Sequence, residues 1–173
     1  INLLMEAEDD PVVWRGPLVS RAVEQFVTDV DWTGTEYLFI DLPPGTSDVP
    51  LTVMQRLPLS GLVVVSSPQE LVGVIVRKAI KMAGMLQVPV LGLVQNMSHL
   101  ICPHCGKKID LFGAVDAGSE DESGITLLAR IPLDPALAAL CDQGKLESYA
   151  DNPFASMVEA IAQSLDARGG DHG

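Results

Sequence analysis

Short apolar runs with almost no polar interruption alternate along this chain with segments of helical periodicity. The runs occupy residues 37–40, 61–67, 88–95 and 125–131. Runs of this length without polar alternation are typical of strands buried on both faces of a parallel sheet. Between and around them, helical patterns occupy residues 18–30, 51–57, 68–86, 134–142 and 153–165, the last with Asn152 as its N-cap. This order predicts an α/β fold, a mostly parallel sheet with helices on both faces.

The stretch EYLFIDLPPGTSD at residues 36–48 places a carboxylate directly after the first apolar run. Residues 37–40 are expected to form a buried strand closed by Asp41, at the carboxyl edge where open α/β sheets bind ligands. Gly45 has an unobstructed N–H that a phosphate could approach. One interpretation is a nucleotide switch, with Asp41 bound through water to Mg²⁺ and Gly45 sensing a γ-phosphate. The other is a strand that ends in an ordinary proline turn.

Composition limits the classes of function that this chain can serve. Its 173 residues are 47% hydrophobic and 20% charged, which fits one globular domain, expected at residues 1–167 with a flexible tail at 168–173. The formal net charge of −12 argues against nucleic-acid and anionic-membrane surfaces, although backbone N–H groups could still bind the phosphates of ATP. No apolar run reaches the roughly 18 residues that a membrane span needs.

Residues 97–123 interrupt the alternation and contain Cys102-Pro103-His104-Cys105-Gly106. This C-P-x-C-G pattern is typical of a metal knuckle, in which backbone N–H groups stabilise two thiolates. The odd count of three cysteines favours a metal or redox pair in a reducing, cytoplasmic setting over a disulfide framework. A small hairpin is expected at residues 107–112. A thioredoxin-like dithiol fits less well, because that motif belongs at a helix start after a strand.

The cysteine pair supplies only half of the four ligands of a closed site. Cys141 is expected in the core, on a helix face with Leu137 and Leu140. Either His99 or His104 could complete a metal site, but polar loop residues are the better interpretation of both. Two copies of the chain around a two-fold axis would together present four thiolates. Such a set accepts zinc or a [4Fe–4S] cluster, and an incidental cysteine pair stays the alternative.

Taken together, these motifs resemble the Mrp-type (ApbC-like) P-loop ATPases, the iron–sulfur cluster carrier proteins of the MinD/ParA-related group. The matching motifs come in the order of the family and cover nearly the whole chain. They are WRGP (14–17), DLPPGTSD (41–48), SSPQE (66–70), VRKAI (76–80), VQNMS (94–98), CPHCG (102–106), LFG (111–113) and RIPLDP (130–135).

The resemblance implies a role for each matched position. Asp41 corresponds to the Walker B-type aspartate near Mg²⁺, Gly45 to the γ-phosphate switch, and Asn96 to the asparagine that reads the adenine edge. Cys102 and Cys105 correspond to the pair that holds a bridging [4Fe–4S] cluster between two subunits. The implied partners are a second copy of the chain, ATP and apo iron–sulfur proteins, with no nucleic acid and no membrane.

One feature of the family is missing from these residues: no G-x-x-x-x-G-K-[ST] phosphate-binding loop is present. The expectation is therefore a carboxyl-terminal portion of a P-loop NTPase fold with an uncovered sheet edge, and ATP hydrolysis by this polypeptide is in doubt. Two functions remain open, an ATP-linked iron–sulfur carrier and a non-catalytic metal-binding or dimerisation module. A membrane-acting MinD-like ATPase is disfavoured, because residues 152–173 lack a basic amphipathic helix.

Overall fold

The computed structural model describes residues 16–112, 124–149 and 154–169. The chain divides into an amino-terminal unit (Ile1–Pro58) and a carboxyl-terminal unit (Leu59–Gly173), each with its own internal packing. The prediction of one domain over residues 1–167 stays a prediction. Trp14, Arg15, Asn152 and most of the predicted tail lie outside the described residues.

In the amino-terminal unit, helices α1 (Gly16–Thr28) and α2 (Asp48–Arg56) pack against each other. Val53 of α2 is 2% exposed, and the buried Thr52 hydroxyl lies 3.0 Å from the Ser20 hydroxyl of α1. A hydrogen bond between two hydroxyls satisfies both groups on burial. Both helices were expected, and each begins a few residues earlier than its apolar pattern indicated.

The strand predicted at residues 37–40 is wrong. The backbone there is irregular, and all four side chains are exposed, with Phe39 84% exposed. Apolar β-branched and aromatic residues favour a strand only when another strand pairs with their backbone and a layer covers their side chains. None of the described strands pairs with this run. Asp41 consequently lies in an exposed loop, and no strand precedes it.

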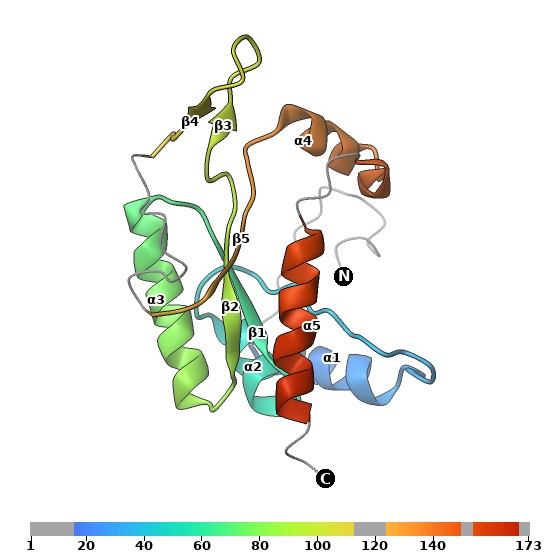
Figure 1. Ribbon diagram of the computed structural model, residues 1–173. Helices are drawn as coiled ribbons and strands as arrows, with labels where there is room; N and C mark the ends of the chain where they lie inside the picture. The colour runs from blue at the N-terminus through green and yellow to red at the C-terminus, as the bar shows by residue number, and fades with distance from the viewer. Residues whose placement is uncertain (1–15, 113–123, 150–153, 170–173) are drawn as a thin grey trace. The chain divides into compact units, whose positions relative to one another are not determined.

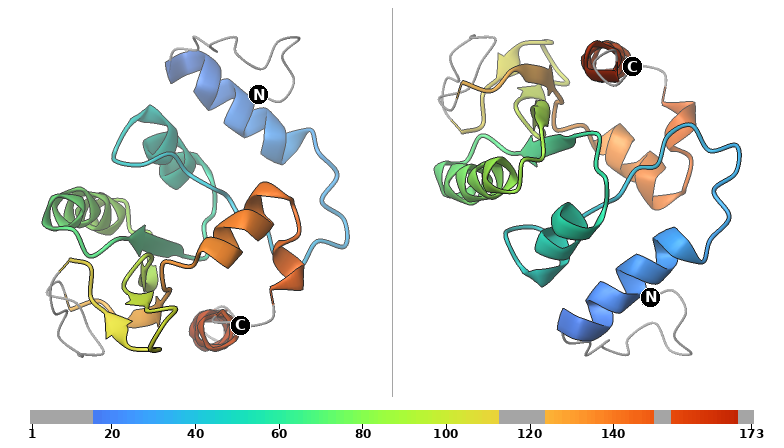
Figure 2. Two further views of the ribbon diagram at one scale, coloured as in Figure 1. Left: turned by 90° about the horizontal axis from the view of Figure 1, so that it is seen from above. Right: turned by 90° about the horizontal axis from the view of Figure 1, so that it is seen from below.

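The carboxyl-terminal unit is built on a parallel three-stranded sheet in the order β1-β2-β5. Its strands are β1 (Leu62–Ser66), β2 (Val90–Gln95) and β5 (Leu127–Arg130). Helix α3 (Glu70–Met85) packs on β1 and β2, while α5 (Ala155–Gly169) packs on β2 and β5. Figures 1 and 2 show the two helices on opposite sides of the sheet. The predicted α/β class and parallel sheet are confirmed.

The core of this unit lies between the sheet and α3. Val64 of β1 and Leu93 of β2 are register partners, and both pack with Val76 of α3 at less than 8% exposure. Burying an aliphatic side chain of this size stabilises the fold by about 1.5–3 kcal/mol. The four middle residues of β2 are buried, whereas Val65 on the edge strand β1 is 61% exposed.

The remaining elements of this unit are short. They are the antiparallel hairpin of β3 (Leu100–Ile101) and β4 (Lys108–Ile109), helix α4 (Pro135–Asp142) and the 3₁₀ turn η2 (Leu146–Ser148). Asp134 caps α4 by accepting a hydrogen bond of 2.8 Å from the Ala136 N–H. The Tyr149 hydroxyl donates to the same carboxylate, and these bonds lower the pKa of Asp134.

Helix α5 continues to Gly169, four residues beyond its predicted end at 165. Among the described residues, no helix has both the length and the apolar character that crossing a membrane requires.

A glycine in the central strand gives a direct test of this packing. A Cβ at Gly92 would lie 2.4 Å from Cγ of Leu128 and 2.8 Å from the Thr126 carbonyl oxygen of the neighbouring chain segment. We expect Gly92→Ala to lower the free energy of unfolding by about 1–3 kcal/mol, because the strands must move apart to admit the methyl group. Urea denaturation measures this change.

Gly84→Ala is the matched control, since its Cβ would meet open space on the exposed side of α3. That substitution should raise stability by up to about 1 kcal/mol through helix propensity. Equal midpoints for the parent and Gly92→Ala would contradict the close approach of the strands.

Candidate functional site

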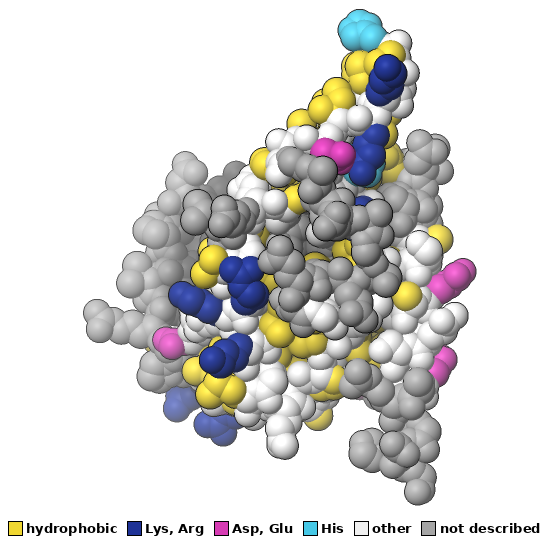
Figure 3. All heavy atoms as spheres, turned by 60° about the vertical axis from the view of Figure 1, so that its left-hand side comes forward, with side chains coloured by type: hydrophobic (Ala, Val, Ile, Leu, Met, Phe, Trp, Pro, Cys, Tyr) yellow, Lys and Arg dark blue, Asp and Glu magenta, His cyan; other side chains and the backbone are white. Residues whose placement is uncertain are grey.

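The cysteine pair lies at the turn of the β3–β4 hairpin. The Cys102 N–H donates to the Lys107 carbonyl at 2.9 Å, and the Gly106 N–H donates to the Cys102 carbonyl at 2.9 Å. Gly106 has φ +67°, a left-handed conformation that glycine adopts without strain. Figure 3 shows the hairpin projecting from the body, with a histidine at its tip. The prediction of a hairpin within residues 107–112 is wrong: residues 108–109 pair with residues 100–101, so the hairpin encloses the cysteine pair.

The turn favours a thiolate at Cys102. Hydrogen bonds from the backbone N–H groups of Cys105 and then His104, followed by the Cys105 side chain, lower the pKa of Cys102 below that of an ordinary thiol. Cys102 is half-buried and Cys105 is exposed, and neither forms a disulfide. Thiolate is the form of cysteine that binds metals. The turn therefore presents two cysteines that are not fully buried, and its hydrogen bonds shift the equilibrium of Cys102 toward the thiolate.

Within the described residues, no group of three or more His, Cys, Asp and Glu side chains could hold a metal ion. His99 is occupied by a hydrogen bond of 2.8 Å to the Ser98 hydroxyl, and His104 is an exposed turn residue. Cys141 was predicted to lie in the core and is exposed. The reason is that α4 buries none of its residues, so its Leu and Ala content does not indicate a covered face.

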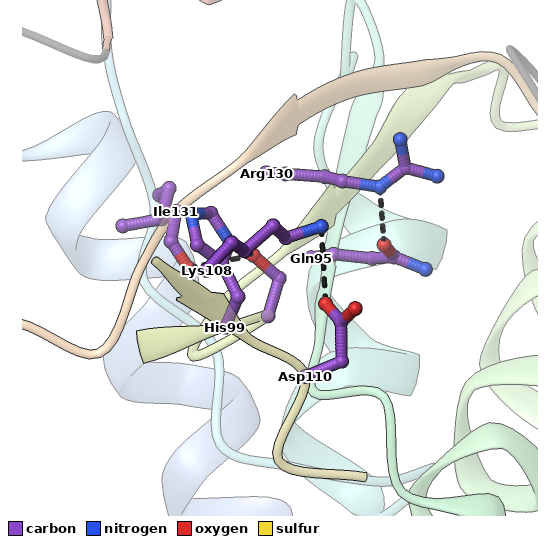
Figure 4. A network of polar contacts seen from close by, with 7 residues as sticks. Gln95, His99, Lys108, Asp110, Arg130 and Ile131 are labelled. Atoms are coloured by element: carbon purple, nitrogen blue, oxygen red, sulfur yellow. Dashed lines mark hydrogen bonds and ion pairs between the residues drawn. The ribbon is translucent and has the colours of Figure 1, made fainter. Parts of the chain in front are cut away.

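Ser98 links the start of the hairpin to the carboxyl end of the sheet by hydrogen bonds. It is 5% exposed, and both its N–H and its hydroxyl donate to the Ile131 carbonyl, at 2.9 and 3.1 Å. The next residue continues the attachment, since the His99 carbonyl accepts a bond of 2.7 Å from the Leu133 N–H. Figure 4 shows this junction beside the Arg130–Gln95 hydrogen bond (3.0 Å) and the Lys108–Asp110 ion pair (3.0 Å).

The ring of His99 lies in a predominantly cationic environment. Burial is the main cause of its lowered pKa, and the charges of Lys108 and Arg130 add to this effect while Asp110 opposes it. A hydroxyl has one hydrogen, so a Ser98 hydroxyl that donates to Ile131 must accept from Nδ1–H of His99. The surroundings thus favour a neutral imidazole with its proton on Nδ1.

Asn96 follows β2 at the carboxyl edge of the sheet, as predicted. Its N–H donates to the Ser66 carbonyl of β1 at 2.7 Å, and its Oδ1 accepts a bond of 2.9 Å from the Met97 N–H. Met97 has φ +53°, a left-handed conformation that non-glycine residues rarely adopt. With Oδ1 accepting from the Met97 N–H, the Nδ2 group of Asn96 bonds to none of the described residues. It can donate to a ligand at this edge.

Asp41 and Gly45 share one loop of the amino-terminal unit, just before α2. Asp41 is exposed, and Gly45 has φ +89° with open space where a Cβ would be. Ser47, at the N-cap position of α2, makes no capping bond with its side chain. Asn96, Cys102 and Cys105 all belong to the carboxyl-terminal unit, where one segment of chain joins them through Ser98 and His99.

Two polar interactions at this site were missed by reasoning from the sequence. Ser98–Ile131 and Gln95–Arg130 each join residues more than thirty positions apart. The sequence did contain one signal for the second interaction: Gln95 and Arg130 are polar residues at the ends of two predicted strands. Because the carboxyl ends of parallel strands share one edge of the sheet, the two side chains could have been expected to lie close together.

Comparison with known structures agrees with the fold. A nucleotide-binding protein from Archaeoglobus fulgidus, solved in complex with ADP and with cobalt found in it, superimposes with a TM-score of 0.67 at 40% identity. The match covers 80% of this chain and 57% of that protein. The sheet and its helices therefore define part of a P-loop NTPase of the α/β class.

Residues 1–166 match the family described as ParA, NUBPL iron-transfer P-loop NTPase, and the chain belongs to this family. An iron-sulfur cluster carrier protein of Clostridium perfringens is 45% identical over 160 residues, covering 91% of this chain and 56% of the relative. One from Methanocaldococcus jannaschii is 40% identical over 176 residues, covering 97% and 60%. The chain thus spans somewhat more than half the length of these relatives, and the resemblance to the Mrp-type ATPases is confirmed.

The pKa of His99 predicts how the stability of the fold changes with pH. Because it is lower in the folded chain than the ordinary value of 6.5, the unfolded chain takes up the proton first on acidification. The contribution of His99 to stability is complete above pH 6.5 and falls as the pH drops toward the folded pKa. We expect the parent to lose more stability than His99→Gln over this interval, measured by urea unfolding at several pH values.

His104 and His172 are present in both proteins, so the difference between the two curves isolates His99. Parallel curves would show that this ring is not held as described.

Proposed function

We propose that this chain carries an iron–sulfur cluster, with Cys102 and Cys105 of two copies holding one [4Fe–4S] cluster between them. The observation that supports this most is the exposed turn that lowers the pKa of Cys102 by backbone hydrogen bonding. The relatives called iron-sulfur cluster carrier proteins match this chain along nearly its whole length.

The number of ligands supports a shared site. Each chain brings two thiolates, and a cubane cluster takes four. A two-fold axis that passes near two hairpin tips would bring equivalent pairs together, and such isologous dimers are the commonest oligomers. The tip projects from the body, as an approach of two copies at this point would require (Figure 3).

Exposure of the pair suits a carrier that releases its cargo. In transfer to an apo iron–sulfur protein, a cysteine thiolate of the recipient replaces Cys102 or Cys105 at each iron. The recipient thiol loses its proton as its Fe–S bond forms, and the departing cysteine takes up a proton as its bond breaks. The cluster keeps its oxidation state. An open turn gives incoming thiolates access that a closed structural site would deny.

A nucleotide would take part by binding at the carboxyl edge of the sheet. The Nδ2 group of Asn96, which bonds to none of the described residues, suits the adenine edge. The resemblance assigns Asp41 and Gly45 to Mg²⁺ and the γ-phosphate, a role that needs a loop to hold the phosphates. ATP would supply a switch between two geometries of the dimer. The 173 residues contain no G-x-x-x-x-G-K-[ST] loop, so the fit of this chain to ATP is partial.

A second candidate function follows from that missing loop. The chain would act as a metal-binding or dimerisation module without ATP hydrolysis, with zinc or a cluster at the same four thiolates. The two functions share the cysteine site and differ in the nucleotide. For both we propose a reducing, cytoplasmic compartment, where the exposed thiols stay reduced.

Anaerobic reconstitution with iron and sulfide tests the cargo. We expect about one [4Fe–4S] cluster per two chains, read from iron and sulfide content, Mössbauer spectra and the mass of the assembly. Cys102→Ser and Cys105→Ser should each abolish it, because a serine hydroxyl does not replace a thiolate at iron. Cys141→Ser is the matched control and should load fully. Full loading of Cys102→Ser, or zinc bound in preference to iron when both are supplied, would reject the cluster.

Calorimetry with Mg·ATP tests the contribution of the nucleotide. We expect this polypeptide to bind ATP weakly and without turnover, because most of the affinity for phosphates comes from the loop that its sequence lacks. Asn96→Ala should weaken the remaining binding further, whereas Gln143→Ala, an exposed site distant in sequence, should not. Micromolar affinity for ATP with measurable hydrolysis would reject the second candidate function, a module that does not hydrolyse ATP.

A further inference from the structure

The outer face of α3 combines cations with exposed apolar side chains. Met85 is 78% exposed, Ile75 48% and Val74 41%, although all three are large hydrophobic residues on a regular helix. Steps of four, seven and eleven residues return to the same side of an α-helix. One stripe therefore carries, in order, Val74, Lys78, Lys81 and Met85. Arg77 lies beside this stripe, and we call these residues with Ile75 the α3 face.

The cations of this face are available to a partner. Arg77, Lys78 and Lys81 are exposed, and the ion pairs formed among the described residues involve other side chains. After Glu70, its first residue, the helix contains no acidic residue. Three of the 11 cations of a chain with net charge −12 thus fall within five residues. A local field of this sign attracts acidic groups against the charge of the whole molecule.

Figure 3 views the unit from this side. Lys and Arg side chains gather there beside hydrophobic ones on the body, and more of them follow the projecting hairpin in the same view. Lys107, next to the cysteine turn, is exposed and has no ion pair with a described residue. Helix α3 begins just after the carboxyl end of β1, and the hairpin leaves the sheet at this same edge, where the Asn96 N–H bonds to the Ser66 carbonyl. A partner that covered the amino-terminal half of the α3 face would therefore lie on the side of the hairpin.

We propose that the α3 face docks an acidic, partly apolar surface of the protein that receives the cluster; the identity of this partner rests on the proposed function. Charge complementarity selects an acidic surface and speeds the encounter. Val74, Ile75 and Met85 supply the apolar contact that excludes water around the charges. A phosphate backbone would gain nothing from these three side chains, so a protein fits this face better than a nucleic acid.

The test measures binding of a labelled, acidic apo-ferredoxin to the full chain without cluster, by fluorescence anisotropy at low and at physiological salt. Lys78→Glu/Lys81→Glu should weaken binding by at least about tenfold and reduce its salt dependence. Arg21→Glu/Lys145→Glu changes net charge equally at exposed sites elsewhere and should stay within about twofold of the parent. Met85→Ser should weaken binding without altering the salt dependence. Thermal unfolding confirms that each variant is folded.

Equal weakening by both charge-reversed pairs, no effect of either, or no binding by the parent would overturn the inference. The inference would also be overturned if Lys78→Glu/Lys81→Glu left apo-ferredoxin binding unchanged but abolished self-association of the chain. Loss of binding to a short DNA duplex in that variant, again with unchanged apo-ferredoxin binding, would overturn it as well. If the chain bound no cluster but still bound apo-ferredoxin through α3, the docking surface would stand and the proposed carrier function would be rejected. A chain that loads the cluster normally, with binding insensitive to α3, would reject this surface alone.

Discussion

The pairing of β2 with a strand on each side is the constraint on which the carboxyl-terminal unit depends. β1 and β5 both run parallel to β2, and helices cover both of its faces. The close approach at Gly92 brings the Leu128 side chain and the Thr126 carbonyl against the β2 backbone. Asn96 and the cysteine hairpin both follow from the carboxyl end of this strand, so its position determines where they lie.

Much of the fold could be predicted because apolar runs of strand length alternate with helical periods. The strands at residues 61–67, 88–95 and 125–131 were found within two residues of their observed ends. Residues 37–40 have the same composition and form no strand. Their pattern shows that burial would be favourable, but a sequence window does not contain the backbone that must pair with it. The Cys141 prediction failed for a similar reason, since the composition of α4 does not reveal which layers cover it.

The candidate site divides in the same way between local and long-range information. Some features of the site are local: the spacing of the cysteines, the glycine that follows them and the strand end at Asn96. The position of each along the chain was predicted correctly. The Ser98–Ile131 attachment and the environment of His99 depend on contacts between strands that only the folded topology brings together. The outer face of α3 was also hidden, because its apolar residues match the pattern expected of a buried helix side.

The shortness of the hairpin determines where the precision of the cysteine turn comes from. Its two strands pair through only Leu100–Ile109 and Ile101–Lys108, and Ile101, Lys108 and Ile109 are exposed. A ribbon of that size is marginal by itself in water. Orientation of the sulfurs is therefore set by the bonds of Ser98 and His99 to Ile131 and Leu133. The CPHCG motif alone, transferred to another protein, would keep the spacing of its two cysteines. It would lose the contacts that fix the orientation of their sulfurs.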